Sequence, residues 1–269
     1  MRAVGVNTLH DKFGISIEEN LRLIKAAGFD CVFSSFTRSF PLKSAVSAAK
    51  KLNLEYETLH APFTACGLEE NLNSMWRENG CGEQYLKLLL ECVDACAQNG
   101  IEKCVIHNAV TENPPPVSEI GLERFSRLFS YAKKCGVRMA VENLESEEHL
   151  SRLMELTGDF HGFCWDCGHN LCYTPMTDIM SLYGKKLICT HVDDNKGVTR
   201  PGIIHYTDDL HLMPFDGALN WEWYAGKIKS CGYTGPLTLE LKDDYLGVGA
   251  AKFYELACKR ALKLCEMCM

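Results

Sequence analysis

The stretch FHGFCWDCGHN, residues 160–170, decides how the rest of the chain is interpreted. An apolar, aromatic-rich run ends at Asp166, and His169 follows three residues later across a glycine. This pattern predicts a buried strand that presents two possible metal ligands at its C-terminal end. Taken alone it is equally typical of a surface turn, because an Asp-x-x-His pair is common by chance. The same ending recurs along the chain, and this repetition favours the strand.

Five further apolar runs end on an acid or a histidine. They are Leu54–His60, Lys103–His107, Val137–Glu142, Lys186–His191 and Pro236–Glu240. Together with the run above and with Ala3–Val6 and Cys31–Phe33, they make eight expected strands. We expect helices over residues 16–28, 42–52, 83–99, 118–135, 146–157, 178–183, 221–230 and 249–264. Strand-then-helix units of about 33 residues each predict an α/β fold in which parallel strands close as a single (β/α)8 barrel.

An open doubly wound sheet is the alternative fold. It is disfavoured because the first strand is followed by Asn7-Thr8-Leu9-His10, which contains no G-x-G-x-x-G fingerprint. We see no linker or low-complexity segment, and barrels of about 250 residues are single domains, so we expect one domain over residues 1–269. Residues 192–220 form the longest irregular stretch, which we expect to act as a lid over a site.

The composition restricts the classes of partner. Of the 269 residues 46% are hydrophobic and 23% are charged, and no run of about 18 apolar residues could span a membrane. The formal net charge of −7 argues against a nucleic-acid partner, because such proteins usually carry a basic face. The first residues turn polar too quickly for a signal peptide, so we expect a cytoplasmic protein. The fifteen cysteines are expected to be reduced thiols.

In such a barrel the C-terminal ends of all strands meet at one mouth. Seven residues of ligand type fall there on this interpretation: His60, His107, Glu142, Asp166, His169, His191 and Glu240. Clustered carboxylates repel one another, and a divalent cation reverses that cost while keeping the acids ionised. Any one of these histidines could be an ordinary hydrogen-bonded core residue, whereas the whole set predicts a metal site.

Several short motifs lie at these strand ends and in the long irregular stretch. They are Leu59-His60-Ala61-Pro62, Val141-Glu142-Asn143, Trp165-Asp166-Cys167-Gly168-His169, His191-Val192-Asp193-Asp194-Asn195, Asp208-Asp209-Leu210-His211 and Gly217-Ala218-Leu219-Asn220-Trp221. In sequence and order they resemble the xylose isomerase-like TIM barrel superfamily. That superfamily contains sugar and sugar phosphate isomerases and epimerases and the apurinic-site endonucleases (AP endonuclease family 2). The resemblance extends from about Asn7 to Glu240 and is far more specific for the superfamily than for a substrate.

The resemblance implies a metal-dependent isomerase or epimerase. It assigns one divalent ion (Mn²⁺, Zn²⁺, Co²⁺ or Mg²⁺) to Glu142, Asp166, His191 and Glu240. The ion would polarise a substrate carbonyl and stabilise an enediolate. Glu142 and Glu240 would remove and return the proton as an acid–base pair. His169 would donate a hydrogen bond to a substrate oxygen.

The expected substrate is a small sugar or polyol. Residues expected to bind it are His60, His107, His211, Arg200 and Trp165. The indole of Trp165 could stack on a sugar face, and Arg200 in the long irregular stretch could meet a phosphate. Phosphorylation of the substrate stays open, as does assembly into a homo-oligomer.

Three other functions stay open. The resemblance also covers phosphodiesterases of the apurinic-site endonuclease type, which use up to three Zn²⁺ ions and additional ligands. Residues at the corresponding places are His60, His107, Asp209 and His211. A polyol or keto acid dehydratase would use the same site as an isomerase. A sugar-binding barrel without catalysis is the third possibility, although every expected ligand position holds a residue that can bind a metal ion.

Overall fold

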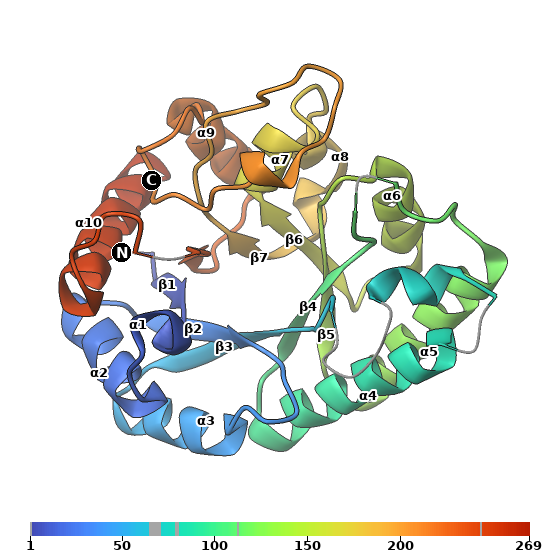
Figure 1. The fold of residues 1–269 in the computed structure, drawn as a ribbon, viewed down its shortest axis with the longest axis horizontal. Coiled ribbons are helices and arrows are strands. Elements are labelled where there is room, and N and C mark those ends of the chain that lie inside the picture. Colours follow the sequence, from blue (N-terminus) through green and yellow to red (C-terminus); the bar gives the residue numbers. More distant parts are fainter. Residues whose placement is uncertain (1, 65–70, 79–80, 112, 243) are drawn as a thin grey trace.

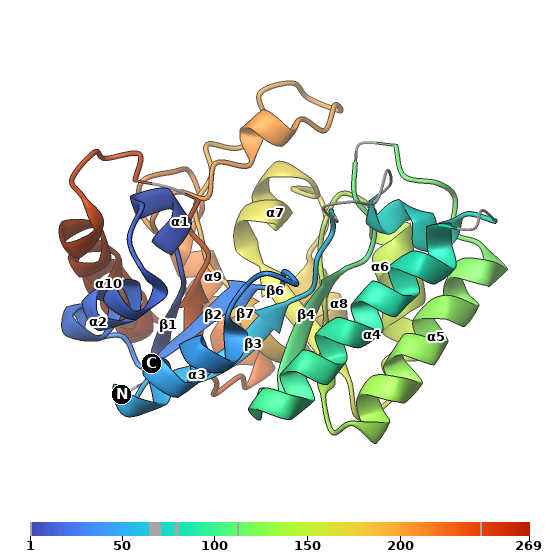
Figure 2. The same cartoon turned by 60° about the horizontal axis from the view of Figure 1, so that its bottom comes forward.

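A barrel of parallel strands lies at the centre of the molecule, with helices around it (Figure 1 and Figure 2). The computed structural model describes all residues except 1, 65–70, 79–80, 112 and 243. Within the described residues eight strands follow the order β7-β6-β5-β4-β3-β2-β1-β8. Val192 bridges Leu239 in parallel, and its N–H donates to the carbonyl of Thr238 at 2.9 Å. This bridge joins β7 to β8, so the predicted (β/α)8 barrel is confirmed.

The strands lie where the apolar runs predict them, within one or two residues at either end. They are β1 (Val4–Asn7), β2 (Cys31–Ser35), β3 (Glu55–His60), β4 (Lys103–His107), β5 (Arg138–Glu142), β6 (Gly162–Asp166), β7 (Leu187–His191) and β8 (Leu237–Leu239). Each of β3 to β7 therefore ends on the acid or histidine that closes its apolar run. The last strand ends at Leu239, one residue before Glu240.

The helices include several short ones that the spacing of apolar residues does not predict. The predicted helices are α2 (Ile17–Ala27), α3 (Leu42–Lys51), α4 (Cys81–Asn99), α5 (Glu119–Lys134), α6 (Glu147–Leu156), α8 (Ile179–Tyr183), α9 (Trp221–Cys231) and α10 (Ala250–Met267). The others are α1 (His10–Phe13), α7 (Cys167–Cys172), and the 3-10 turns η1 (Leu72–Trp76), η2 (Gly184–Lys186) and η3 (Tyr206–Asp208).

The ends of the predicted helices have identifiable causes. The Ser118 hydroxyl accepts from the N–H of Gly121 at the start of α5, and the Ser146 hydroxyl accepts from the N–H of His149 at the start of α6. Helix α2 ends at Gly28, whose φ of 107° favours glycine over any residue with a side chain.

Two apolar layers hold the barrel together. Side chains on the outer face of the strands pack against the helices in one large cluster. A smaller cluster fills the barrel interior and consists of Val105, Ala140, Cys164 and Cys189, all buried. The small size of these four residues suits the narrow interior of an eight-stranded barrel.

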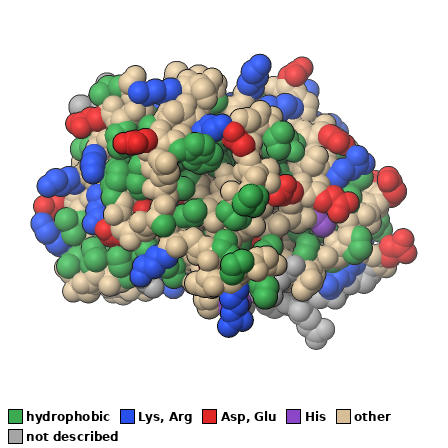
Figure 3. All heavy atoms as spheres, turned by 90° about the horizontal axis from the view of Figure 1, so that it is seen from above, with side chains coloured by type: hydrophobic (Ala, Val, Ile, Leu, Met, Phe, Trp, Pro, Cys, Tyr) green, Lys and Arg blue, Asp and Glu red, His purple; other side chains and the backbone are tan. Residues whose placement is uncertain are grey.

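Fourteen of the fifteen cysteines lie in the described residues, and each of them is a free thiol, as predicted. The remaining one, Cys66, lies outside the described residues. On the face seen in Figure 3, acidic and basic side chains are interspersed around hydrophobic ones. Among the helices described here, none combines the length and apolarity that a membrane span requires.

Candidate metal centre

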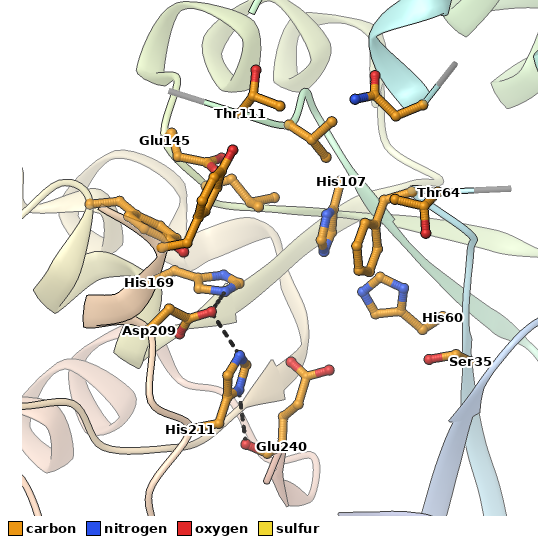
Figure 4. A pocket seen from close by; sticks show the side chains of 16 residues that line it. Ser35, His60, Thr64, His107, Thr111, Glu145, His169, Asp209, His211 and Glu240 are labelled. Atoms are coloured by element: carbon orange, nitrogen blue, oxygen red, sulfur yellow. Dashed lines mark hydrogen bonds and ion pairs between the residues drawn. The ribbon is translucent and has the colours of Figure 1, made fainter. Parts of the chain in front are cut away.

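A cavity of about 350 Å³ opens at the C-terminal end of the barrel. Figure 4 shows five of the predicted residues around it, namely His60, His107, His169, His211 and Glu240. They come from β3, β4, α7, the long irregular stretch and the end of β8. The barrel therefore gathers residues that are up to 180 positions apart in sequence, since 240 − 60 = 180.

Glu142 lies beneath the cavity floor, where three histidines surround its carboxylate. Its Oε2 is 3.2 Å from Nε2 of both His60 and His107, and its Oε1 is 2.8 Å from Nδ1 of His191. The strand register explains this convergence, because His107 at the end of β4 pairs with Glu142 at the end of β5. The Glu142 side chain is completely buried, so it contacts only protein groups in this structure.

The four predicted metal ligands lie close enough to share one ion. One ligand atom from each of Glu142, Asp166, His191 and Glu240 lies within 4.8 Å of all the others. Nδ1 of His191 is 2.8 Å from Glu142 and 2.9 Å from Oε2 of Glu240. Both spacings are hydrogen-bond lengths. Two ligands bound to the same ion at 2.0–2.2 Å in tetrahedral geometry lie roughly 3.3–3.6 Å apart, so an ion would separate these groups by roughly half an ångström.

A second set of possible ligands adjoins the first. Oδ2 of Asp209 is 2.9 Å from Nε2 of His211 and 3.5 Å from Nε2 of His169 (Figure 4). His169 belongs to α7, which begins directly after β6 because the Asp166 carboxylate accepts from the N–H of His169 at 2.6 Å. Asp209 and His211 come from the long irregular stretch, the part of the chain where we expected a lid.

The protonation of the histidines depends on their neighbours. Burial alone would lower the pKa of His191, but the carboxylates of Glu240 and Glu142 outweigh it and raise that pKa well above its usual value. Burial would also lower the pKa of His169, but the nearby carboxylates of Asp166 and Asp209 outweigh it and raise that pKa well above its usual value. At His107 burial prevails and lowers the pKa to about 4. The neighbouring acids therefore favour the charged imidazolium forms of His191 and His169.

Asp166 carries the clearest sign of a missing partner. Its side chain is completely buried, and within the described residues its Oδ2 accepts no hydrogen bond and has only Nδ1 of His169, 3.6 Å away, as an ion-pair partner. Burial, followed by the nearby carboxylate of Asp193, raises the pKa of Asp166 well above its usual value. A buried carboxylate oxygen without a donor is costly unless a cation compensates it. The donor set of three carboxylates and one imidazole therefore fits a divalent ion.

Sequence reasoning missed the residues that support these ligands. Nδ1 of His211 forms a hydrogen bond of 3.1 Å with the backbone carbonyl of Glu240 and lies 2.7 Å from Oδ2 of Asp193, and these two contacts hold the ring so that its Nε2 faces Asp209. The Asp194 carboxylate accepts from the N–H groups of Phe215, Gly217 and Leu219 and so holds the long stretch against the barrel. The motif around residue 191 contained both aspartates, but the sequence gives no signal for which partner each one contacts.

Two of the predicted substrate contacts, Trp165 and Arg200, do not lie on the cavity wall. Because side chains alternate along β6, Trp165 points away from the mouth when Asp166 points into it. Trp165 is completely buried and stacks on Tyr224, with ring centroids 4.7 Å apart, so it cannot stack on a substrate. Arg200 is exposed in the long irregular stretch and does not line the cavity. The aromatic rings that do line it include Tyr173 and Phe63, and Phe63 stacks on His107.

Comparison with known proteins gives a consistent result. A family model described as the xylose isomerase-like TIM barrel matches residues 21–262. An uncharacterised protein of Sinorhizobium fredii is 28% identical over 238 residues, which is 83% of this chain and 74% of that protein. An uncharacterised protein of Methanocaldococcus jannaschii is 27% identical over 206 residues, covering 69% of this chain and 64% of that protein.

Solved structures share the fold at low sequence identity. A fusion of a xylose isomerase-like TIM barrel with a 4-hydroxyphenylpyruvate dioxygenase gives a TM-score of 0.79 at 17% identity. The match covers 99% of this chain but only 43% of the fusion protein. D-allulose 3-epimerase from Methylomonas sp., in complex with D-allulose, gives 0.73 at 13%, covering 100% and 98% of the two chains. The IolI protein with a binding zinc atom gives 0.73 at 18%, also covering 100% and 98%.

Proposed function

Because this chain belongs to the xylose isomerase-like TIM barrel family, we propose that it is a divalent-metal-dependent isomerase or epimerase of a sugar or sugar phosphate. The main support for the proposal is the geometry of four residues. One ligand atom from each of Glu142, Asp166, His191 and Glu240 lies within 4.8 Å of the others, and one oxygen of the buried Asp166 carboxylate accepts no hydrogen bond from the described residues. The epimerase with bound D-allulose and the zinc-containing IolI protein, which share this fold, support it.

Glu142, Asp166, His191 and Glu240 would hold the ion. Three carboxylates and one imidazole form an oxygen-rich set that suits Mn²⁺, Zn²⁺, Co²⁺ or Mg²⁺. When bound, the ion would polarise a substrate carbonyl and so make the neighbouring C–H more acidic. The cavity is large enough for a small molecule, because ligand pockets begin at about 300 Å³.

The two proposed proton-transfer groups differ in their access to the cavity. Glu240 lines the cavity, and its pKa is held at about 2, because His191 and its hydrogen bond outweigh the effect of burial. Glu142 lies below the floor, behind His60 and His107. In our proposal Glu240 therefore exchanges a proton with the substrate directly from the mouth, and Glu142 acts from the opposite side of the four-residue set. His169 on the cavity wall would donate to a substrate oxygen.

The test is exchange of a substrate proton with solvent. Protein loaded with Mn²⁺ is incubated with a panel of ketoses and aldoses in D₂O, and deuterium incorporation next to the carbonyl is followed by NMR. Incorporation with conversion to an isomer or epimer would support the proposal, and loss of water from the substrate would indicate a dehydratase instead. No incorporation with any sugar, by protein shown to contain the ion, would contradict the proposal.

A metal-dependent phosphodiesterase is the second candidate, because a further observation favours it. Glu142, a member of the four-residue set, also contacts His60 and His107. A further set lies beside it and consists of His169, Asp209 and His211. These residues could hold up to three Zn²⁺ ions, which would activate water against a phosphate ester. The net charge of −7 argues against a DNA substrate. Three zinc ions per chain together with cleavage of an oligonucleotide containing an abasic site would favour this candidate.

A further inference from the structure

We infer that the substrate is an uncharged sugar or polyol and not a phosphate ester. This inference rests on the proposed function and concerns the wall of the same cavity. It depends on three features: the absence of lysine and arginine from the described wall, the capped N-termini of α6 and α7, and the acidic residue opposite Glu240.

The first feature is the chemistry of the cavity wall. Its described lining residues are Ser35, His60, Phe63, Thr64, Asn71, His107, Val110, Thr111, Leu144, Glu145, His169, Tyr173, Tyr206, Asp209, His211 and Glu240. None of these is a lysine or an arginine. The residues outside the described part are Met, Ala, Cys, Gly, Leu, Glu, Asn and Asp, so they supply no basic side chain either. Proteins commonly bind phosphate groups with arginine or lysine.

The nearest basic side chains have other partners or lie in solvent. Lys242 is exposed and donates from its Nζ to the backbone carbonyl of Asp209 at 3.1 Å. Lys196 and Arg200 are exposed in the long irregular stretch. Hydrogen bonds from Thr199 lower the pKa of the Asp208 carboxyl, and the charge of Arg200 adds a smaller effect in the same direction. None of the three lines the cavity in the described structure.

The second feature is that the two helices that begin beside cavity-lining residues, α6 and α7, have capped N-termini. A helix N-terminus can bind phosphate through its free N–H groups. At α7 the carboxylate of Asp166 occupies that place. At α6 the hydroxyl of Ser146 caps the helix, and Glu147 and Glu148 stand in its first turn. A phosphate would therefore meet negative charge at both helices.

The third feature is Glu145, which lies with Thr111 at one end of the cavity while Glu240 lies at the other (Figure 4). The Glu145 carboxylate would repel a phosphate on a substrate held at Glu240, whereas it could accept hydrogen bonds from sugar hydroxyl groups. Ser35, Thr64, Asn71 and Thr111 add neutral groups that can both donate and accept. Phe63 and Tyr173 supply aromatic surface for a sugar ring.

The test compares matched substrates with and without the phosphate. Mn²⁺-loaded protein is titrated with D-ribulose and D-ribulose 5-phosphate, and with D-fructose and D-fructose 6-phosphate, by calorimetry and by the D₂O exchange assay. We expect the neutral sugar of at least one pair to bind and exchange at least about tenfold better than its phosphate ester, a difference of about 1.4 kcal/mol. Equal or better binding of the esters would overturn the inference but leave the proposed function intact. Failure of every sugar in both assays would overturn the proposed function itself, and with it this inference.

A charge reversal at Glu145 provides the matched variant. We expect Glu145→Lys to improve binding of a phosphate ester about tenfold or more over the wild type. The control is Glu266→Lys, which makes the same change of charge at an exposed position near the C-terminal end of α10 that does not line the cavity. If Glu145→Lys does not fold, Glu145→Gln should shift the preference in the same direction by a smaller factor. Equal effects of the Glu145 and Glu266 changes would contradict a role for the cavity wall.

Discussion

Charged side chains lie inside this barrel at two levels, and they are neutralised in different ways. In the lower half Nζ of Lys103 lies 2.8 Å from Oε1 of Glu57, and the hydroxyl of Thr238 donates to the same carboxylate. At the mouth the acids Glu142, Asp166, Asp193, Asp209 and Glu240 face one another, and histidines are the only cationic groups among the ligand sets of the described residues.

This difference indicates that the Glu57–Lys103 pair has a structural role, whereas the acids of the mouth have a functional one. Glu57 is an extra residue in β3, at the point where its register with β2 shifts, and the bulge turns its carboxylate toward Lys103. One acid and one base cancel there, so the lower pair is complete without any ligand. The negative charge of the acids at the mouth is compensated only while the histidines there are protonated or a cation is bound. We therefore expect the lower pair to control stability and the mouth to control activity.

The largest expected effect is a loss of activity when a mouth residue, Glu240, is replaced. Glu240→Gln keeps the size of the side chain but removes its ability to take up a proton, so turnover should fall roughly 10²–10⁴-fold, the usual contribution of a general acid or base. The deuterium exchange assay measures this change, and urea unfolding in the presence of metal should show only the smaller stabilisation expected of a site that lacks one ligand charge. Full exchange activity in Glu240→Gln protein would exclude this residue as the proton carrier.

The next largest effect concerns stability at the lower pair. Lys103→Met leaves the buried Glu57 carboxylate without its counterion, which should cost roughly 3–5 kcal/mol of unfolding free energy. The double variant Lys103→Met with Glu57→Gln should recover much of that loss because no uncompensated charge remains. Chemical denaturation of the three proteins gives these values. A double variant as unstable as Lys103→Met would show that lost packing, not lost charge balance, is the cause.

Metal removal tests the balance at the mouth. An ion that binds only the folded protein should stabilise it by about 2.7 kcal/mol when present at about 100 times its dissociation constant. Thermal unfolding with chelator and with Mn²⁺ measures the gain. The same comparison with Asp166→Asn protein, which lacks one ligand charge, should show a clearly smaller gain. An equal gain in both proteins would mean that the ion binds elsewhere.

The smallest expected effect is the dependence of this gain on pH. The pKa of His191 is raised in the folded protein because Glu240 and Glu142 outweigh burial. Its charge therefore contributes stability below the unfolded value of about 6.5, and this contribution is lost as pH rises through the raised pKa. Metal-free protein should lose stability between pH 6 and pH 8, whereas metal-bound protein should not. The gain from Mn²⁺ should thus be larger at pH 8, and a gain that falls with pH would contradict this.

The sequence predicts most of the barrel and the residues at its strand ends, because an apolar run that stops at a charged residue marks both a strand and its direction. His107, Glu142, Asp166 and His191 are each the last residue of a strand for this reason. The direction of Trp165 could also have been predicted, since alternation along β6 places it opposite Asp166.

The rest of the cavity wall, beyond the predicted histidines and Glu240, could not be predicted from the sequence. Thr111 adopts a positive φ of 81°, next to Val110, whose N–H and carbonyl both bond to Asn73 from η1. These contacts join segments almost forty residues apart, and no local pattern indicates them. The six-residue helix α7 is too short for a periodic signal, and only its cap at Asp166 fixes where it begins.

The most direct test of this account is an anomalous-scattering map from crystals soaked in Mn²⁺. We predict a peak at coordination distance, about 2.0–2.6 Å, from the ligand atoms of Glu142, Asp166, His191 and Glu240. The peak should disappear from crystals of Asp166→Asn protein that still diffract. Ordered Mn²⁺ elsewhere in the crystal, with no density between these four residues, would contradict the claim that a divalent ion neutralises the acids of the mouth.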